Sequence, residues 1–214
     1  MKITYLFKGI YHGKSLARIL LNWHCREYLA HLEGKVIDLG SGSGASYHKY
    51  LSNKAELIKT DGRAAKNLDA QIDLNDQLKI PGNFFDNAIL FNVLYILKDP
   101  SHSLKEINRI LKPGGKLLLS TPLIFNESPE PVDYWRFTFQ GLRIILEQSG
   151  FKNIKIIRMG ERFSSGVMLI NPWQKLGFLN YFLYPLALLL DKLLPKKIKE
   201  FHPCPLGYLV VCEK

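Results

Sequence analysis

The chain has 214 residues, of which 47% are hydrophobic and 22% are charged. These values exclude a disordered chain and allow one domain with a full core plus a modest addition. The formal net charge of +10 suits an anionic partner, such as nucleic acid, a phosphorylated substrate or a membrane surface. Solvated lysines on an ordinary basic domain explain the charge equally well.

The chain contains three cysteines, Cys25, Cys204 and Cys212. Their odd number and scattered positions fit neither a disulfide framework nor the ligand spacing of a zinc site. We therefore expect reduced thiols and no bound metal. Residues 1–8 lack the long apolar stretch of a secretory signal, so we expect a cytoplasmic protein.

The first predicted element is a helix over residues 15–32, where apolar residues recur at helical spacing, and we expect it to cap one edge of the domain. After residue 35, strand-like runs alternate with helical segments. The strand-like runs are 35–39, 57–61, 70–73, 86–91, 116–120, 154–158 and 207–212. This alternation predicts an α/β fold with a parallel sheet covered by helices on both faces.

Two later helices have clear ends. The first is predicted over 100–111 and is followed by a turn at 112–115, Lys-Pro-Gly-Gly, that leads into the next strand. The second is predicted over 139–149. Thr138 is the expected N-cap of this helix, and Gly150 is its expected C-terminal stop.

The clearest functional signal is the run Val36-Ile37-Asp38-Leu39-Gly40-Ser41-Gly42-Ser43-Gly44. It predicts a buried strand that ends in a three-glycine turn, where the backbone can approach a ligand closely. The N–H groups of the turn and of a following helix are expected to face that ligand. Asp38 favours a nucleotide-like ligand with a positively charged end over one that is all phosphate.

Further polar residues are expected at the carboxyl ends of the next strands. Asp61 ends the second strand, where a carboxylate can accept both hydroxyls of a ribose. Asp73 and Leu74 follow the third strand and place an acceptor beside an apolar contact. Asn92 ends the fourth strand and reaches the same crevice. The glycines alone do not separate nicotinamide cofactors from others.

Five motifs in this order resemble a known family. They are the Asp-x-Gly-x-Gly-x-Gly turn, Asp61, Asp73-Leu74, the Phe85-Asp86 strand and the run from Glu106 through Arg109 to Gly115. Together they resemble the class I S-adenosylmethionine-dependent methyltransferases, over residues 35–151 and again over 205–214. The run 133–138, Asp-Tyr-Trp-Arg-Phe-Thr, is similar to a type 11-like bacterial branch linked to glycan and cell-envelope pathways.

The resemblance implies a Rossmann-like sheet of seven strands, mostly parallel with an antiparallel last strand, and S-adenosylmethionine across the carboxyl ends of strands one to four. It places Asp38 near the methionine ammonium, Asp61 on the ribose, and Asp73 on the adenine amino group with Leu74 against the ring. Asn92 would line the methionine side. The residues expected to make room for the cofactor are Gly40, Ser41, Gly42 and Gly44.

One departure concerns the base. Many relatives carry an acid–histidine pair after the fourth strand, where this chain has Tyr95 and Ile96. A histidine base is therefore not available at that place, and any base must come from elsewhere. The residues expected to face the methyl group are Tyr134, Arg136 and Tyr95. Arg136 can instead clamp a substrate phosphate or carboxylate. The alternative is that 134–136 pack their loop, with Arg136 paired to Asp133.

The predicted domain organisation has three parts. Residues 1–34 form an N-terminal helical cap, 35–162 with 204–214 form the methyltransferase domain, and 163–203 form an apolar helical insert. Within the insert, 176–190 has no charge and lysines flank it, which suits a segment lying in a membrane interface through 176–194. Packing over the sheet edge or against a second subunit explains the same pattern.

These features predict a methyltransferase that modifies an oxygen or nitrogen of a small-molecule or glycan acceptor. The basic charge and the apolar insert favour an acceptor that is anionic or lipid-linked. The alternatives are RNA methylation, which the charge permits without a recognisable RNA-binding module, and a non-catalytic protein that binds the cofactor. We expect a monomer or homodimer in the cytoplasm, with contact to the inner membrane face as a further expectation.

Overall fold

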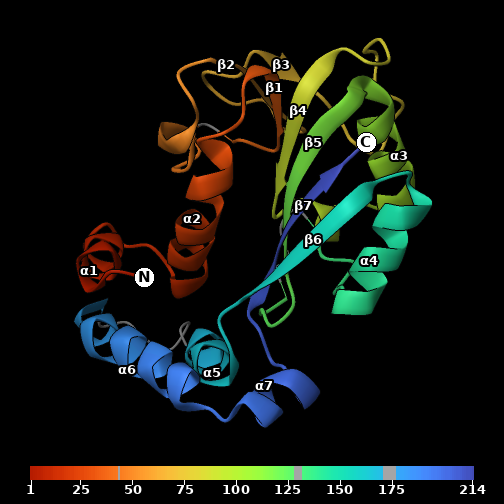
Figure 1. Ribbon diagram of the computed structural model, residues 1–214. Coiled ribbons are helices and arrows are strands. Elements are labelled where there is room, and N and C mark those ends of the chain that lie inside the picture. Colours follow the sequence, from red (N-terminus) through yellow and green to blue (C-terminus); the bar gives the residue numbers. More distant parts are fainter. Residues whose placement is uncertain (43, 128–131, 171–176) are drawn as a thin grey trace.

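The computed structural model describes residues 1–42, 44–127, 132–170 and 177–214. Its seven strands form one sheet in the order β3-β2-β1-β4-β5-β7-β6 (Figure 1). β7 is antiparallel to both of its neighbours, and the remaining pairs are parallel. The predicted Rossmann-like sheet is therefore confirmed. The strands are β1 (Gly34–Leu39), β2 (Ala55–Asp61), β3 (Ala70–Gln71), β4 (Phe85–Phe91), β5 (Leu111–Pro122), β6 (Lys152–Met159) and β7 (Gly207–Glu213).

The helices lie on both faces of the sheet, with α1 and α2 on one side and α3 and α4 on the other (Figure 1). Thr138 caps α4 as predicted, since its side chain accepts a hydrogen bond from the Gly141 N–H at 3.2 Å. The helices are α1 (Ile3–Tyr11), α2 (Leu16–Leu29), α3 (Pro100–Ile110), α4 (Phe139–Gln148), α5 (Arg162–Ile170), α6 (Asn180–Leu193) and α7 (Lys196–Phe201).

The two faces of the sheet carry separate apolar cores, because successive residues of a strand point to opposite faces. In β1, Ile37 packs into the core beneath α3 and α4, whereas Val36 packs into the core beneath α2. The same alternation separates Leu117 from Leu118 in β5. Burial on both faces explains why these strands read as continuous apolar runs.

Besides β5, which begins at Leu111 and so includes the predicted turn at 112–115, two features differ from the predicted elements. The connection from β1 to β2 holds a single 3₁₀ turn, His48–Tyr50, and no α-helix among its described residues. The face that such a helix would cover is occupied by α2, whose Leu16, Ile19 and Leu20 pack in the same core as Val36. The second difference is α1, an additional helix before the predicted one.

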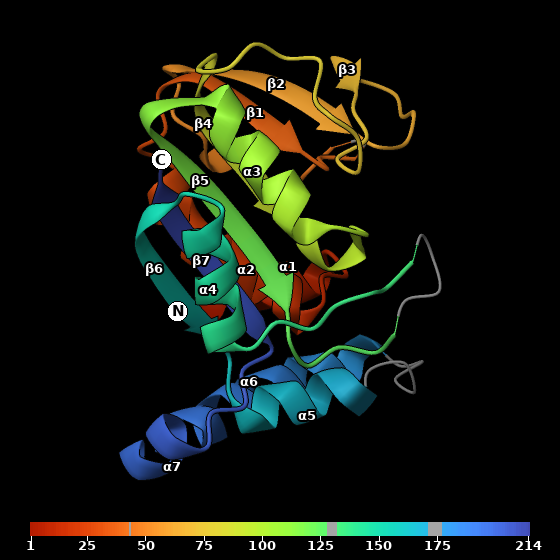
Figure 2. The ribbon, with the colours of Figure 1, turned by 90° about the vertical axis from the view of Figure 1, so that its right-hand side faces the viewer.

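The segment between β6 and β7 contains α5, α6 and α7, which lie together at one end of the molecule (Figure 2). Asp191 of α6 is buried and caps the start of α5. Its carboxylate accepts hydrogen bonds from the Phe163 N–H at 2.8 Å and from the Ser164 hydroxyl at 2.5 Å. Within the described residues, no helix combines the length and apolar character needed to cross a membrane.

Candidate functional site

The glycine turn follows β1 directly and is built around Gly40. This residue has φ +101°, a conformation that L side chains rarely adopt, and a Cβ there would lie 2.3 Å from Val93 Cγ2. The Gly40 and Ser41 N–H groups both donate to the Thr60 carbonyl, at 2.9 and 3.0 Å. Gly42 also has a positive φ, +58°, whereas Gly44 does not and has open space around its Cα. Hence Gly40 is fixed by both sterics and backbone conformation.

Three adjoining cavities run along the carboxyl ends of the strands, and together they form one cleft. The first, of about 420 Å³, lies over β2, β3 and β4. The second, of about 680 Å³, lies over the glycine turn, and the third, of about 320 Å³, lies between α2 and β5. Gly40 borders all three, Asp61 borders the first and second, and Asn92 borders the first and third.

The first cavity brings together several residues that the sequence marked. Asp61, at the end of β2, accepts a hydrogen bond from the Gly42 N–H at 2.9 Å, which ties the glycine turn to the second strand. Asp73 faces the same cavity, although β3 ends two residues earlier than predicted. Its Oδ1 accepts from the Asn75 N–H at 2.9 Å. Leu74 is buried at the apolar wall of the cavity.

Asn92 follows β4 with φ +55°, a left-handed conformation that asparagine tolerates better than most residues. Its side-chain oxygen accepts a hydrogen bond from the Ser120 hydroxyl at 3.2 Å, and its N–H donates to the Ser120 carbonyl at 2.9 Å. Both bonds hold Asn92 at the junction of the first and third cavities.

Asp38 is the residue expected near the methionine ammonium. Its side chain is fully buried beneath the turn and is not among the residues lining the three cavities. The Tyr47 hydroxyl donates to Asp38 Oδ2 at 2.8 Å, and His48 Nε2 lies 2.5 Å from the same oxygen. Burial raises the pKa of Asp38, and the hydrogen bonds from His48 and Tyr47 oppose that rise. In this geometry the Asp38 carboxylate supports the turn through its contacts with Tyr47 and His48.

Of the three catalytic candidates, Tyr95 alone is among the residues that line the cleft, in the first and third cavities. Burial, and to a lesser degree the charge of Asp133, raises the pKa of Tyr95. Its hydroxyl therefore stays protonated at neutral pH and suits hydrogen-bond donation better than proton abstraction.

Arg136 is held in an ion pair with Asp133, which its second guanidinium nitrogen contacts at 2.7 Å. The guanidinium also lies over the Tyr95 ring, 5.5 Å from its centroid. These contacts match the alternative interpretation from the sequence, in which Arg136 pairs with Asp133 and stabilises its own loop. The Tyr134 side chain is 47% exposed, and its N–H donates to the Tyr95 carbonyl at 3.0 Å.

The start of α2 also borders the cleft, and no residue of this helix is among the site residues predicted from the sequence. Ser15 caps α2 by accepting from the Arg18 N–H at 3.3 Å, and both residues line the second and third cavities. Among the described residues, no acid lies within ion-pair distance of the Arg18 guanidinium. Tyr47 and His48 were also missed, because their only sequence signal is their place after the glycine turn.

The described part of the chain contains no group of three or more His, Cys, Asp or Glu side chains that could hold a metal ion. The residues around the cleft fit an adenosyl sulfonium instead. A carboxylate at the end of β2 lies beside an apolar wall, and a turn in which Gly40 admits no Cβ borders all parts of the cleft.

This sheet, with its glycine turn and strand-end carboxylates, has the architecture of a class I S-adenosylmethionine-dependent methyltransferase. Comparison with known proteins then gives the family. A family model described as a methyltransferase domain matches residues 17–156, more than half of the chain. The chain therefore belongs to this methyltransferase family, and it is an enzyme with S-adenosylmethionine as its cofactor. Its narrower likeness to the type 11-like glycan branch stays a prediction.

Two curated relatives illustrate the range of acceptors. A tRNA U34 carboxymethyltransferase from Hydrogenovibrio crunogenus is 27% identical over 217 residues, which cover 87% of this chain and 63% of that protein. A demethylmenaquinone methyltransferase from Corynebacterium urealyticum is 34% identical over 100 residues, covering 42% of this chain and 44% of that protein. The chain thus spans less than two thirds of the length of either relative.

Solved structures support the fold. A SAM-dependent methyltransferase from Archaeoglobus fulgidus superposes with a TM-score of 0.63 at 18% identity. The match covers 98% of this chain and 99% of that one. At this identity the likeness establishes the fold and leaves the acceptor open.

Proposed function

We propose that this enzyme methylates an oxygen or nitrogen atom of an anionic small-molecule or glycan acceptor, either free or lipid-linked. The observation that carries the proposal is the third cavity, which adjoins the cofactor cleft at Gly40, Asn92 and Tyr95 and is bordered by Arg18. A cavity of about 320 Å³ suits a small molecule or one sugar ring. An arginine without an acidic partner in the described residues can bind a carboxylate or phosphate through two parallel hydrogen bonds.

In this proposal the cofactor lies along the first and second cavities. Asp61 binds the ribose hydroxyls, Asp73 binds the adenine amino group, and Leu74 lies against the ring. Asn92 lines the methionine part. Asp38 acts indirectly, by fixing Tyr47 and His48 beneath the turn. The backbone around the cofactor comes from Gly40, Ser41, Gly42 and Gly44.

When bound, S-adenosylmethionine supplies a methyl group on a positively charged sulfur. The residues of this chain then need to orient the acceptor and exclude water, and orientation alone is worth up to about 7–11 kcal/mol in well-aligned reactions. We assign Tyr95 to hydrogen-bond donation toward the acceptor. Arg136 holds residues 132–138 over Tyr95, and Tyr134 extends that border.

The decisive experiment supplies methyl-labelled S-adenosylmethionine and fractionated bacterial extract to the wild-type enzyme and to Arg18→Gln. We expect label in an anionic small-molecule or glycolipid fraction. We expect Arg18→Gln to lower transfer by about tenfold or more, and to lower cofactor affinity by less than that, because Arg18 borders the second cavity as well as the third. Arg143→Gln, on α4, is the matched control and should transfer like wild type. Cofactor binding without label in any fraction would instead identify a non-catalytic binding protein.

RNA methylation is the second candidate, and two observations favour it. The relative that covers 87% of the chain is a tRNA U34 carboxymethyltransferase, and a net charge of +10 suits a nucleic acid. A gel shift with bulk tRNA at increasing salt tests it, because binding through phosphate contacts weakens steeply as salt is raised. Label recovered in tRNA rather than in small molecules would replace the first proposal.

We also propose the domain division expected from the sequence, with a helical cap over 1–34, the methyltransferase domain over 35–162 and 204–214, and an apolar helical insert over 163–203. The position of α5, α6 and α7 between β6 and β7 supports it. We further propose a cytoplasmic monomer or homodimer. Light scattering of the purified protein distinguishes these two states.

A further inference from the structure

α6 has two apolar faces, and only one of them is covered. Tyr184 and Ala187 are buried, together with the capping carboxylate of Asp191. The opposite face repeats at intervals of three and four residues and stays exposed, by 37% to 69% of each side chain. Its members are Phe182, Leu186, Leu189 and Leu193.

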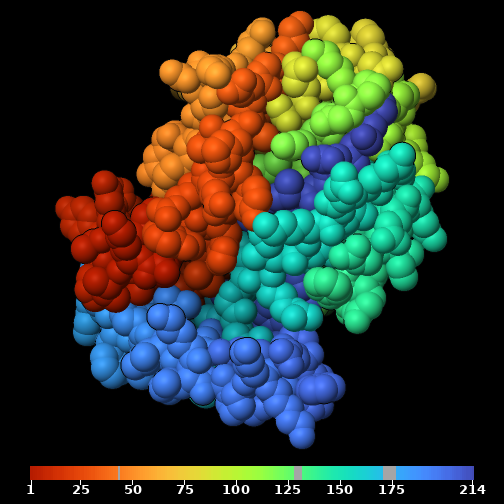
Figure 3. Space-filling view, viewed as in Figure 1, coloured from red at the N-terminus to blue at the C-terminus, as the bar shows by residue number. Residues whose placement is uncertain are grey.

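α1 continues this exposed surface. Leu6 and Ile10 are its buried side chains, whereas Ile3, Phe7 and Tyr11 lie on one stripe and are exposed. The two helices meet where the Phe7 and Tyr181 rings contact each other, with their centroids 5.8 Å apart. Figure 3 shows α1 beside α6 at the end of the molecule that α6 and α7 form. We call the exposed side chains of α1 and α6 the apolar end face.

Lysines border the apolar end face. They are Lys192 at the end of α6 and Lys196, Lys197 and Lys199 in α7, with Lys2 and Lys8 at α1. None of the six forms an ion pair with a described residue. The single acid of α6, Asp191, is turned inward to cap α5, and Glu200 is the one acid of α7. The rim therefore carries a clear positive excess.

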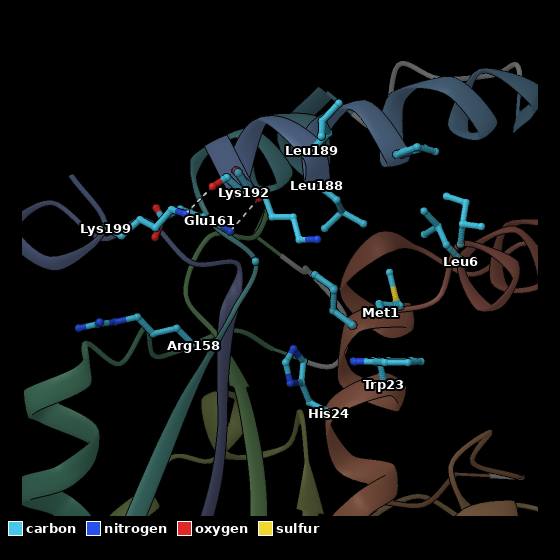
Figure 4. A pocket seen from close by; sticks show the side chains of 15 residues that line it. Met1, Leu6, Trp23, His24, Arg158, Glu161, Leu188, Leu189, Lys192 and Lys199 are labelled. Atoms are coloured by element: carbon cyan, nitrogen blue, oxygen red, sulfur yellow. Dashed lines mark hydrogen bonds between the residues drawn. The ribbon is translucent and has the colours of Figure 1, made fainter. Parts of the chain in front are cut away.

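A cavity of about 650 Å³ lies between α6 and the two N-terminal helices. Figure 4 shows Leu188 and Leu189 on its α6 side, with Trp23 and Met1 across from them. The charged side chains that line it are Arg158, Lys192 and Lys199 together with Glu161 and Asp191. The cavity is therefore of mixed charge, and the positive excess belongs to the lysines around the apolar end face.

We propose that the apolar end face docks on an anionic lipid bilayer. Aromatic and aliphatic side chains beside a cationic rim match the interface of such a membrane, where apolar groups enter the acyl boundary and lysines meet acidic headgroups. A contiguous exposed apolar surface of this kind marks an interaction site in a soluble protein. The lysine rim selects a negatively charged lipid surface over a second, equally basic copy of this chain.

This location connects the apolar end face with the cleft. Met159 ends β6 just before α5, and Leu206 precedes β7 just after α7, and both line the third cavity. The segment from α5 to α7, which carries the α6 part of the apolar end face, therefore begins and ends at the wall of the proposed acceptor cavity. An enzyme held this way would meet an acceptor at the membrane surface, although docking itself does not depend on which acceptor is used.

The test is co-sedimentation of the full chain with vesicles of phosphatidylcholine mixed with phosphatidylglycerol, compared with phosphatidylcholine alone. One variant combines Phe182→Ser with Leu189→Ser, and another combines Lys196→Glu with Lys197→Glu. The matched controls are Ile144→Ser, an exposed apolar residue of α4, and Lys105→Glu on α3. A thermal shift with S-adenosylmethionine shows that each variant is folded and keeps the cofactor site.

We expect the wild type and both controls to bind the anionic vesicles, and each docking variant to bind about tenfold or more weakly. Binding to neutral vesicles should be weaker than binding to anionic ones. The proposal is overturned if the folded wild type binds neither kind of vesicle, or if the docking variants bind like wild type. A wild-type dimer that the combined Phe182→Ser and Leu189→Ser variant dissociates, without vesicle binding, would overturn it in favour of self-association. A retained thermal shift keeps each of these failures separate from failure of the methyltransferase assignment.

Discussion

The Tyr47 hydroxyl donates a 2.8 Å hydrogen bond to the fully buried carboxylate of Asp38, beneath the glycine turn. A buried carboxylate is costly unless donors surround it, and Tyr47 and His48 supply them here. The relationship makes Asp38 part of the floor of the cleft.

Tyr47→Phe removes one donor from Asp38 and should lower the free energy of unfolding by about 1–3 kcal/mol at neutral pH. Because the pKa of Asp38 is raised by burial, the folded state binds a proton more tightly than the unfolded state. Stability from this group is therefore full below the unfolded pKa of about 3.9 and falls as pH rises through the folded value. The gap between variant and wild type should widen with pH in urea denaturation, and Tyr11→Phe should show no gap.

The glycine turn offers a matched pair of substitutions. Gly40→Ala must keep a strained φ and displace Val93, and we expect it to destabilise the fold by about 2–4 kcal/mol and to weaken cofactor binding. Gly44→Ala meets open space and should change stability by less than about 1 kcal/mol. Thermal unfolding with and without S-adenosylmethionine measures both. Equal effects of the two substitutions would contradict this account of the turn.

Asp61→Ala should weaken the binding of S-adenosylmethionine by about 10–100-fold, because the proposed ribose acceptor and the hydrogen bond from Gly42 are lost together. The cofactor affinity of Asp61→Asn should lie between those of Asp61→Ala and wild type, since asparagine retains one acceptor oxygen. Asp76→Ala, an exposed carboxylate nearby, serves as the control. Titration calorimetry decides the point, and unchanged affinity in Asp61→Ala would remove Asp61 from the cofactor site.

Glu106 and Arg109 of α3 form an ion pair at 2.8 Å, and Arg109 also donates to the carbonyls of Leu78 and Ile80. The pair lowers the pKa of Glu106, so its contribution is full above the unfolded value of about 4.3 and is lost as pH falls through the folded value. Because the pair is partly exposed, we expect Glu106→Gln to cost only about 1–2 kcal/mol at pH 7 and nothing at low pH.

The control for that measurement is Glu147→Gln, which removes the exposed, 3.6 Å pair with Arg143. Such surface pairs contribute about 0–1 kcal/mol, so this variant should stay close to wild type in denaturant unfolding. If Glu147→Gln lowered the free energy of unfolding as much as Glu106→Gln, the cause would be the change in net charge rather than the loss of the ion pair in α3.

The sequence predicted the sheet well because both of its faces are buried. β4 and β5 contain the buried apolar runs 88–91 and 117–119, and this local pattern is sufficient to find them. The antiparallel β7 came from the family resemblance rather than from any local pattern. α1 was missed, since its apolar stripe is short and half of it faces solvent.

The cleft was predicted less evenly. Asp61 and Leu74 follow strands and were found from strand ends alone, whereas Arg18 belongs to a helix far from any motif. For Asp38, the sequence does not determine the direction of the side chain. Sequence spacing places it at the strand end, but which face its side chain takes depends on packing with Tyr47. Pairing of Arg136 with Asp133 was one of two open interpretations, and the loop geometry contains that pair.

The antiparallel placement of β7 has a consequence for how such an enzyme can diversify. β7 lies between β5 and β6, so the chain leaves the sheet after Met159 and returns at Gly207, next to where it left. Helices added within that excursion can grow or change without disturbing the strands that carry Asp61 and Asn92. Sequence changes in these helices can therefore alter the proposed docking surface and the wall of the proposed acceptor cavity together, while the strands that border the first cavity stay unchanged.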